Sequence, residues 1–105
     1  MHRNSHDNKA PHHLYEIFDK QEKEVFKYGI SSDPIDEDGM SRRVRRQLGL
    51  LNLAAGWIRY FVRILLTGIS GRQRAEEIED EYIENFEKEH GKMPRGNLRK
   101  NRKKR

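Results

Sequence analysis

Hydrophobic and polar residues alternate with two different periods along this chain, and the two periods predict three strands and two helices. Short apolar runs at residues 14–18 and 25–30 are dominated by Leu, Tyr, Ile, Phe and Val, which is typical of strands. An apolar stripe with helical spacing begins after Ser41, which is a good N-cap. Residues 57–66 are rich in aromatic and β-branched residues, and a second helical stripe follows within residues 71–90.

The register of the first two strands decides which of their side chains share a face. If the turn between them is centred on Gln21 and Glu22, Tyr15 lies opposite Tyr28, and both rings lie on one face of the sheet. No Asn-Gly or Asp-Gly pair fixes this turn, and a slip of one residue would break the arrangement. The predicted fold class is α+β: a small three-stranded, mainly antiparallel sheet with flanking helices, in the order β-β-α-β-α.

The segment from Trp57 to Leu66 also permits two other interpretations. Arg59 and Arg63 are four residues apart, which suits a helix, but the high β-propensity of the segment favours a strand. Residues 48–70 are long enough to span a bilayer, but each of the two arginines near their centre would cost about 2.5–3.5 kcal/mol on insertion. We therefore expect a strand, and no stable insertion into a membrane.

Composition and charge narrow the classes of function. Charged residues make up 37% of the 105 residues and hydrophobic residues 33%, so we expect one small domain, over residues 11–97. Residues 1–10 are predicted to be disordered or a linker, and residues 98–105 a basic tail. The absence of cysteine excludes disulfides and thiolate zinc sites. The net charge of +5 favours a polyanionic partner, most simply nucleic acid.

One acidic residue of the last predicted helix lies on its apolar side. In a helical projection most of the acids, Asp80 among them, face solvent, whereas Glu79 falls within the apolar stripe. A carboxylate in that position needs a partner, which is either an arginine (Arg43, Arg59 or Arg63) or a metal ion. Carboxylate oxygens suit magnesium, which commonly takes one or two protein carboxylates beside phosphate oxygens.

The order of these polar candidates resembles the GIY-YIG endonuclease superfamily. "HLY" at residues 13–15 and "KYG" at residues 27–29 stand where the two strand motifs of that family are found, with a tyrosine as the literal match in each. The stretch from Gly71 to Asn97 is similar to the final helix and loop of small GIY-YIG-like toxin domains. Such domains form the C-termini of large bacterial polymorphic toxins, including Rhs-type proteins. The resemblance covers about residues 13–97.

The resemblance implies a metal-dependent endonuclease and a role for each candidate residue. Glu79 binds one Mg²⁺ or Mn²⁺ ion, Arg43 stabilises the transition state, and Asn97 positions the loop or a water. Tyr15 or Tyr28 orients or deprotonates the attacking water. The backbone of the nucleic acid, with DNA favoured, is held by further basic residues: Arg42, Arg45, Arg46, Arg95, Arg99 and Lys100.

The same residues leave other interpretations open. A non-catalytic nucleic-acid-binding module would share the basic surface, but it would not need Glu79 in the apolar stripe. A membrane-perturbing toxin built on residues 48–70 is a third class, and His12 or His13 is an alternative base to the tyrosines. The toxin resemblance further implies export within a larger protein, action in the cytoplasm of a target cell, and a cognate immunity protein.

Overall fold

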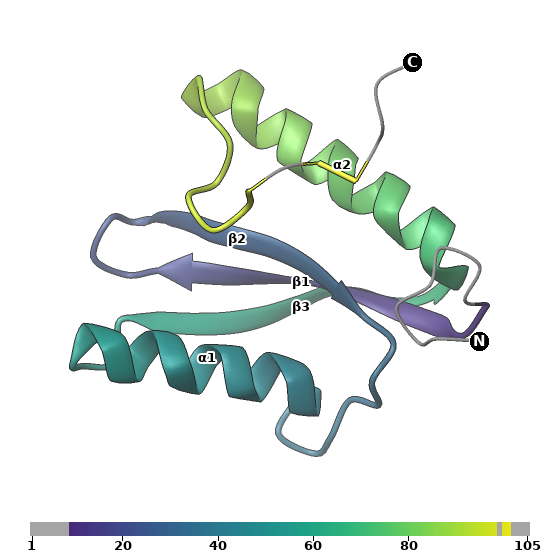
Figure 1. Ribbon diagram of the computed structural model, residues 1–105, viewed down its shortest axis with the longest axis horizontal. Helices are drawn as coiled ribbons and strands as arrows, with labels where there is room; N and C mark the ends of the chain where they lie inside the picture. The colour runs from purple at the N-terminus through teal and green to yellow at the C-terminus, as the bar shows by residue number, and fades with distance from the viewer. Residues whose placement is uncertain (1–8, 99, 102–105) are drawn as a thin grey trace.

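The two short apolar runs form an antiparallel hairpin, and the third predicted strand completes the sheet. In the computed structural model, β1 (Pro11–Asp19) is the central strand, between β2 (Glu24–Ser31) and β3 (Tyr60–Ser70) (Figure 1). Both pairings of β1 are antiparallel. Because neighbouring strands cover both edges of β1 and helices cover both faces, residues 12–17 are all buried. The strand predicted within residues 57–66 is confirmed, although it begins at Tyr60 and extends to Ser70.

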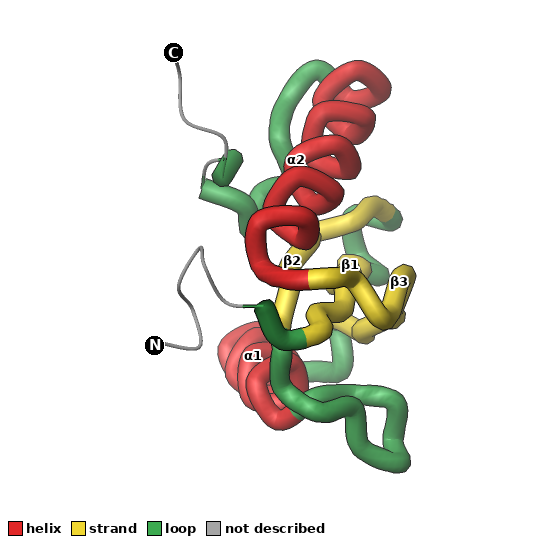
Figure 2. The backbone as a smooth tube through the Cα atoms, turned by 90° about the vertical axis from the view of Figure 1, so that its right-hand side faces the viewer, coloured by secondary structure: helices red, strands yellow, loops and turns green. Residues whose placement is uncertain are grey.

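One helix covers each face of the sheet. α1 (Arg42–Ala55) and α2 (Gly71–His90) pack on opposite sides of the strands, so the fold has three layers (Figures 1 and 2). Ser41 is the N-cap of α1, as predicted, and its hydroxyl accepts a hydrogen bond from the backbone N–H of Val44 at 3.4 Å. Gly91 ends α2 in the left-handed conformation that glycine adopts without strain. The predicted α+β fold and its order of elements are confirmed.

Each helix buries its apolar stripe against a different set of strand residues. The core on the α1 face is built on Tyr15, Ile17, Val44 and Tyr60. The core on the α2 face is built on Leu14, Ile30, Ile69 and Ala75. Successive residues of β1 thus contribute to opposite cores, and a change in register moves side chains from one core to the other.

The predicted register of the hairpin is right at the turn and wrong beyond it. Next to the turn, Asp19 pairs with Glu24, as the prediction requires. A β-bulge then adds one residue of β2, so Tyr15 lies opposite Gly29 and not opposite Tyr28. Because alternate residues of a strand face opposite sides, Tyr28 faces α2 while Tyr15 faces α1. The prediction that both rings share one face is therefore wrong.

The structure describes residues 9–98, 100 and 101. The predictions of a disordered segment or linker at residues 1–10 and of a basic tail at residues 98–105 fall mostly outside these residues. Of the residues after Leu98, the two that are described, Lys100 and Asn101, lie against α2. None of the described helices is long and apolar enough to cross a membrane.

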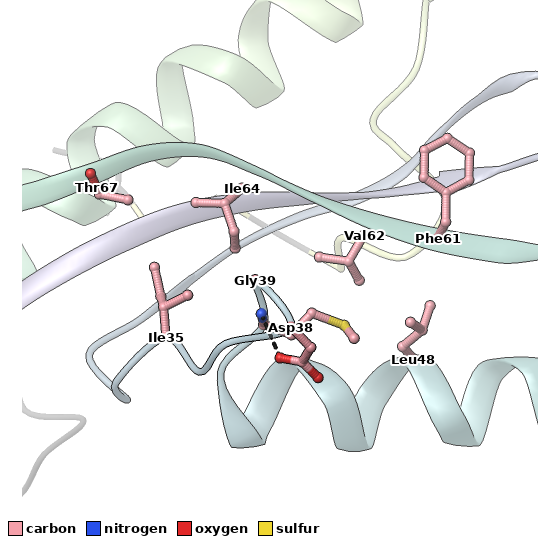
Figure 3. A pocket seen from close by; sticks show the side chains of 9 residues that line it. Ile35, Asp38, Gly39, Leu48, Phe61, Val62, Ile64 and Thr67 are labelled. Atoms are coloured by element: carbon pink, nitrogen blue, oxygen red, sulfur yellow. Dashed lines mark hydrogen bonds between the residues drawn. The ribbon is translucent and has the colours of Figure 1, made fainter.

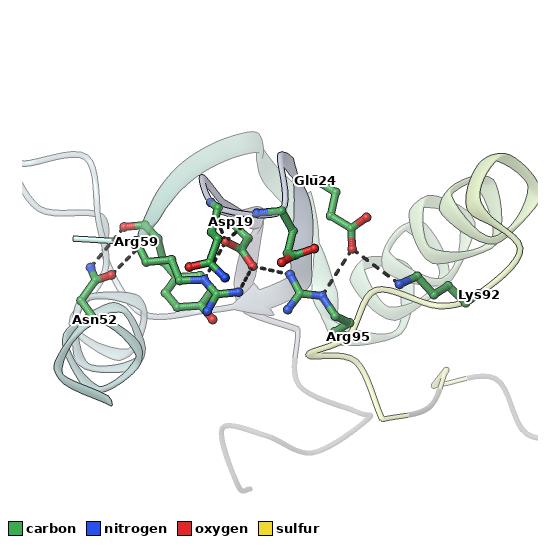
Figure 4. A network of polar contacts seen from close by, with 9 residues as sticks. Asp19, Glu24, Asn52, Arg59, Lys92 and Arg95 are labelled. Carbon is green, nitrogen blue, oxygen red and sulfur yellow. Dashed lines mark hydrogen bonds and ion pairs between the residues drawn. The ribbon is translucent and has the colours of Figure 1, made fainter. Parts of the chain in front are cut away.

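A buried carboxylate at the end of β1 joins three segments that are distant in sequence (Figure 4). Asp19 is 0% exposed and accepts two hydrogen bonds, at 2.8 and 2.7 Å, from the guanidinium of Arg59, where the chain enters β3. The backbone N–H groups of Gln21 and Glu22 in the hairpin turn donate to the same carboxylate at 2.9 and 3.3 Å. Arg95, in the loop after α2, also donates to it. The network therefore ties the hairpin turn, β3 and the loop after α2 together.

These donors keep Asp19 ionised. The hydrogen bonds from Arg59 hold the pKa of Asp19 well below its ordinary value of 3.8, and the contacts from Arg95 and the turn act in the same direction, against the effect of burial. Because this pKa is lower in the folded protein than in the unfolded chain, ionised Asp19 stabilises the fold fully above its ordinary pKa. The contribution is lost as the pH falls towards the folded-state value.

We expect Asp19→Asn to lower the free energy of unfolding at pH 7 by about 3 kcal/mol, because two arginines would lose their buried counter-charge. Urea unfolding at several pH values measures this loss, and the difference from the wild type should shrink below about pH 4. Asp36→Asn is the control, since Asp36 forms an exposed ion pair with Arg45 and its removal should change stability little. Equal losses in the two variants would contradict the role given to Asp19.

Candidate functional site

A hollow beside β2 gathers polar and charged side chains from both helices, from the hairpin and from the segment after α2. The strand order places β2 at an edge of the sheet, and the segment after α2 runs along it, with the N–H of Gly96 donating to the carbonyl of Phe26 at 2.7 Å. Side chains of opposite charge meet in this hollow. Its polar lining residues are Tyr15, Lys27, Arg43, Arg72, Glu79, Asn97 and Asn101. Four of the five predicted catalytic residues are therefore brought together, and Tyr28 is the exception.

Tyr15 reaches the hollow because its partner across the hairpin has no side chain. The ring is 1% exposed, and it lies over Gly29, where an added Cβ would be 2.3 Å from both Cζ and Oη of the tyrosine. Gln47 of α1 donates from Nε2 to the Tyr15 hydroxyl at 3.1 Å, and its Oε1 accepts from Nζ of Lys27 at 3.2 Å. Because an ammonium group can donate but not accept, these contacts fix the amide orientation. They leave the Tyr15 proton available for donation into the hollow.

Burial shifts the pKa values of Tyr15 and Lys27 in opposite directions. Burial raises the pKa of Tyr15 above its ordinary value of 10.0, although Gln47 and Arg43 oppose the shift. Burial lowers the pKa of Lys27, and the charge of Arg43 adds to this effect while Glu79 opposes it. Tyr15 is therefore a hydrogen-bond donor at neutral pH, whereas Lys27 moves towards the range in which an amine can accept a proton.

Glu79 is buried, and the segment after α2 supplies its hydrogen-bond donor. The residue is 8% exposed, and its Oε1 accepts a hydrogen bond from the side-chain amide of Asn101. Burial raises the pKa of Glu79, while the Asn101 contact and the charges of Arg72 and Lys27 act against this. The carboxylate thus lies among cations without a direct ion pair to them in the described part of the chain.

Two predictions made for the last helix are wrong. Arg59 and Arg63 are not the partners of Glu79, because each pairs with an acid of β1. Asp80, which was expected to face solvent, is 2% exposed, and its Oδ1 accepts a hydrogen bond from the backbone N–H of Asn101 at 2.8 Å. The segment after α2 covers a side of the helix that a helical projection shows as exposed.

The structure does not bring the hydroxyl of Tyr28 into the hollow, so the catalytic role predicted for it has no support in the geometry. Its ring packs against Tyr82 on the α2 face, with ring centroids 5.5 Å apart. Asn97 instead holds the backbone of Tyr28: its Nδ2 donates to the carbonyl and its Oδ1 accepts from the N–H, both at 2.9 Å. His12 and His13, the alternative bases, are buried in β1 and do not line the hollow either.

The predicted nucleic-acid-binding residues divide into two groups. Arg42 and Arg46 line a polar hollow at the N-terminal end of α1 together with Arg43, Asp33 and Asp36. Arg43 also lines the hollow beside β2. Arg99 lies outside the described residues. The others already have acidic partners within the chain: Arg45 pairs with Asp36 and Asp38, Arg95 with Asp19 and Glu24, and Lys100 with Glu84 and Glu87.

One carboxylate is available to a metal ion in this site. Among residues 9–98, 100 and 101, no three His, Asp or Glu side chains are grouped so that they could share a metal ion. Glu79 meets the looser requirement of Mg²⁺ or Mn²⁺, which prefer oxygen ligands and accept water and phosphate beside one or two protein carboxylates. Since Lys27, Arg43 and Arg72 line the same hollow, we expect such an ion to bind weakly until a phosphate adds negative charge.

A second hollow lies between α1, β3 and the loop that precedes α1 (Figure 3). Asp38 is its one charged lining residue, and Arg45 already donates to that carboxylate at 3.0 Å. The remaining lining is largely apolar, with Ile35, Leu48 and Phe61 among its side chains. Because it offers no cation to a phosphate, the candidate site is the hollow beside β2.

Four residues of the site, Lys27, Gln47, Arg72 and Asn101, were not predicted from the sequence. Gln47 follows Arg43 by one helical turn, and Arg72 precedes Glu79 by two turns, so both share a helix face with a residue that was predicted. No pattern in the sequence indicated Lys27, because the bulge in β2 decides on which face of the sheet its side chain lies.

A comparison with protein families agrees with this architecture. A family model described as "URI fold toxin 2" matches residues 5–91, which include all five elements of the fold. Of the residues that line the hollow, Asn97 and Asn101 lie beyond the matched range. No match to this chain was found among curated proteins or among solved structures.

We expect Gly29→Ala to destabilise the fold by about 2 kcal/mol, because the new methyl group would displace the buried Tyr15 ring from the hollow. Thermal unfolding measures the loss, and tyrosine fluorescence or NMR reports the displaced ring. Gly49→Ala is the matched control, since a Cβ at this position of α1 meets no atom within 4 Å and should stabilise the helix by about 0.5–1 kcal/mol. A Gly29→Ala protein as stable as the wild type would contradict the close packing.

Proposed function

Since the chain belongs to the URI fold toxin 2 family and is a toxin domain of the URI fold, we propose that it hydrolyses phosphodiester bonds of nucleic acid as a metal-dependent endonuclease of the GIY-YIG type. The observation that supports this proposal is the composition of the hollow beside β2. A buried carboxylate, Glu79, lies there with three cations, Lys27, Arg43 and Arg72. A phosphodiester accompanied by a divalent cation brings charges of both signs: the phosphate attracts the cations of the hollow, and the metal ion attracts Glu79.

Arg43 and Arg72 are the residues that we assign to the scissile phosphate. A guanidinium can donate two parallel hydrogen bonds to phosphate oxygens, and it stays charged at any pH at which the protein is folded. A guanidinium stabilises the pentavalent transition state more than the bound substrate, because negative charge on the phosphate oxygens increases in that transition state. Glu79 would hold the divalent cation, which when bound supplies positive charge to the phosphate and to the leaving oxygen.

Lys27 and Tyr15 are the groups that we assign to the attacking water. Lys27 must first release its own proton to solvent in order to accept one from the water, and burial and the charge of Arg43 favour this because they lower its pKa. Tyr15 donates a hydrogen bond that orients the water. Gln47 contacts both side chains and so keeps them at a constant separation. Lys27 thereby takes the role of base that the sequence had suggested for Tyr15 or Tyr28.

Arg42 and Arg46 extend the proposed site along the nucleic-acid backbone. The first turn of α1 contains no acidic residue and instead carries Arg42 and Arg43 at the positive end of the helix dipole. This placement is unfavourable for the isolated helix. Asp33 and Asp36 in the same hollow offset part of the repulsion, and an anionic ligand would offset more of it. Contacts of this kind hold DNA, which we favour, or RNA in a manner that depends on salt and little on sequence.

The toxin family membership supports a wider proposal about setting. We assign the domain to a larger exported protein that acts in the cytoplasm of a target cell. A producing cell would then need an immunity protein, and an acidic surface on that protein would complement Arg42, Arg43 and Arg46, which share their hollow with Asp33 and Asp36.

Nuclease activity is tested by incubating the protein with plasmid DNA and, separately, with total RNA in the presence of Mg²⁺ or Mn²⁺. We expect cleavage that EDTA abolishes and that Glu79→Gln reduces about 100-fold or more. Glu77→Gln is the matched control, because Glu77 is an exposed acid on the same helix. Folded wild-type protein that binds but does not cleave either nucleic acid would favour a binding module. Full activity in Glu79→Gln would remove Glu79 from the site.

The two tyrosines provide a second test, since each can lose its hydroxyl and keep its ring. We expect Tyr15→Phe to reduce the cleavage rate at least tenfold. The loss should not exceed the roughly 10²–10⁴-fold that a positioned proton-transfer group contributes. Tyr28→Phe should leave the rate unchanged, because that hydroxyl lies on the α2 face. Single-turnover kinetics with both variants measures the effect. Equal losses in the two would contradict the separation of the tyrosines.

A further inference from the structure

Asn101, the last residue that the structure describes, contacts two buried acids of α2, Glu79 and Asp80. The backbone N–H of Asn101 donates to Oδ1 of Asp80 at 2.8 Å. Its side-chain amide Nδ2 lies 3.2 Å from the same oxygen and 3.4 Å from the carbonyl of Glu76, and it also donates to Oε1 of Glu79. A single side chain therefore contacts two consecutive carboxylates and the helix backbone.

Several hydrogen bonds hold Asn101 against α2, although its neighbours in sequence are charged. Asp80 is 2% exposed, so its carboxylate requires hydrogen bonds from within the protein, and Asn101 supplies donors from both its backbone and its side chain. Lys100 adds an ion pair to Glu87 at 2.6 Å. These contacts attach residues 100 and 101 to α2, in a region where the sequence predicted a basic tail.

The chemistry of residue 101 differs from that of the residues around it. In "LRKNRKKR", at residues 98–105, Asn101 is the one uncharged polar residue among six Arg and Lys residues. A Lys or Arg against Glu79 would neutralise the carboxylate and compete with a metal ion for it. An amide donates a hydrogen bond and adds no charge, so the carboxylate keeps its attraction for a cation.

We propose that Asn101 is a positioning residue of the candidate site, which holds Oε1 of Glu79 so that Oε2 is presented to a divalent cation. Within the described residues, the hydrogen bond to Glu79 is made at Oε1, and this leaves Oε2 for the ion. The inference rests on the proposed function, because it assigns the cation to Glu79. It extends the site beyond residues 5–91, the range shared with the toxin family, to a residue near the end of this chain.

The proposal is tested by measuring Mn²⁺ binding to the full-length protein without nucleic acid, by electron paramagnetic resonance of free Mn²⁺. We expect Asn101→Ala to weaken Mn²⁺ binding about tenfold or more, as is usual when a group that orients a metal ligand is removed. Asn101→Lys should weaken Mn²⁺ binding further, because the lysine ammonium would neutralise Glu79. The lysine could still pair with the acids of α2, so residue 101 should stay attached to the helix. Asn85→Ala, at an exposed asparagine of α2, should bind Mn²⁺ like the wild type.

A second measurement separates this proposal from the proposed function. In metal-free protein, the Asn101 side-chain amide should give NMR signals shifted by its carboxylate contact, and Glu79→Gln should remove that shift. If Asn101→Ala and Asn101→Lys bind Mn²⁺ as tightly as the wild type, the positioning role is overturned and the nuclease proposal stays in place. Tighter Mn²⁺ binding in Asn101→Ala would also overturn it, since Asn101 would then obstruct the site. Wild-type protein that binds no Mn²⁺, either alone or with inorganic phosphate added, would overturn both.

Discussion

The buried carboxylate of Asp19 is the interaction on which the arrangement of this small fold depends. A chain with 37% charged and 33% hydrophobic residues cannot bury a large apolar core, so polar contacts must help to place its segments. Asp19 is withdrawn from water and recovers its hydrogen bonds from the hairpin turn, from Arg59 before β3 and from Arg95 after α2. The same carboxylate thus closes the hairpin, places β3 and returns the chain to β2, where Asn97 pairs with the strand backbone.

The hairpin contributes one tyrosine to the candidate site because of a bulge and a glycine. The extra residue in β2 turns Tyr28 towards α2 and places Gly29 opposite Tyr15. The space left by the missing Cβ admits the Tyr15 ring, and the amide of Gln47 then links its hydroxyl to Lys27. In the proposed site the pair of tyrosines is therefore replaced by a tyrosine and a lysine. Burial keeps Tyr15 protonated as a hydrogen-bond donor, and it lowers the pKa of Lys27.

The hollow beside β2 combines charges that would be unfavourable separately. Glu79 is costly to ionise where it is buried, and the cations that line the hollow repel one another. Asn101 donates a hydrogen bond to the Glu79 carboxylate without adding charge. The protein without a ligand therefore keeps both the negative charge of Glu79 and the positive charges around it. A metal ion and a phosphate together would relieve both costs, which gives a physical reason for binding them jointly and for weak binding of either alone.

Local sequence patterns are sufficient to specify the secondary structure, the order of the elements and the place of Glu79 on the covered side of α2. These features depend on local periodicity and on caps such as Ser41 and Gly91, which act within a few residues. Long-range packing sets the register beyond the bulge, buries Asp80 and brings Lys27 and Arg72 to the hollow that contains Glu79. Each of these depends on contacts between segments far apart in the chain, to which local propensity and spacing are insensitive.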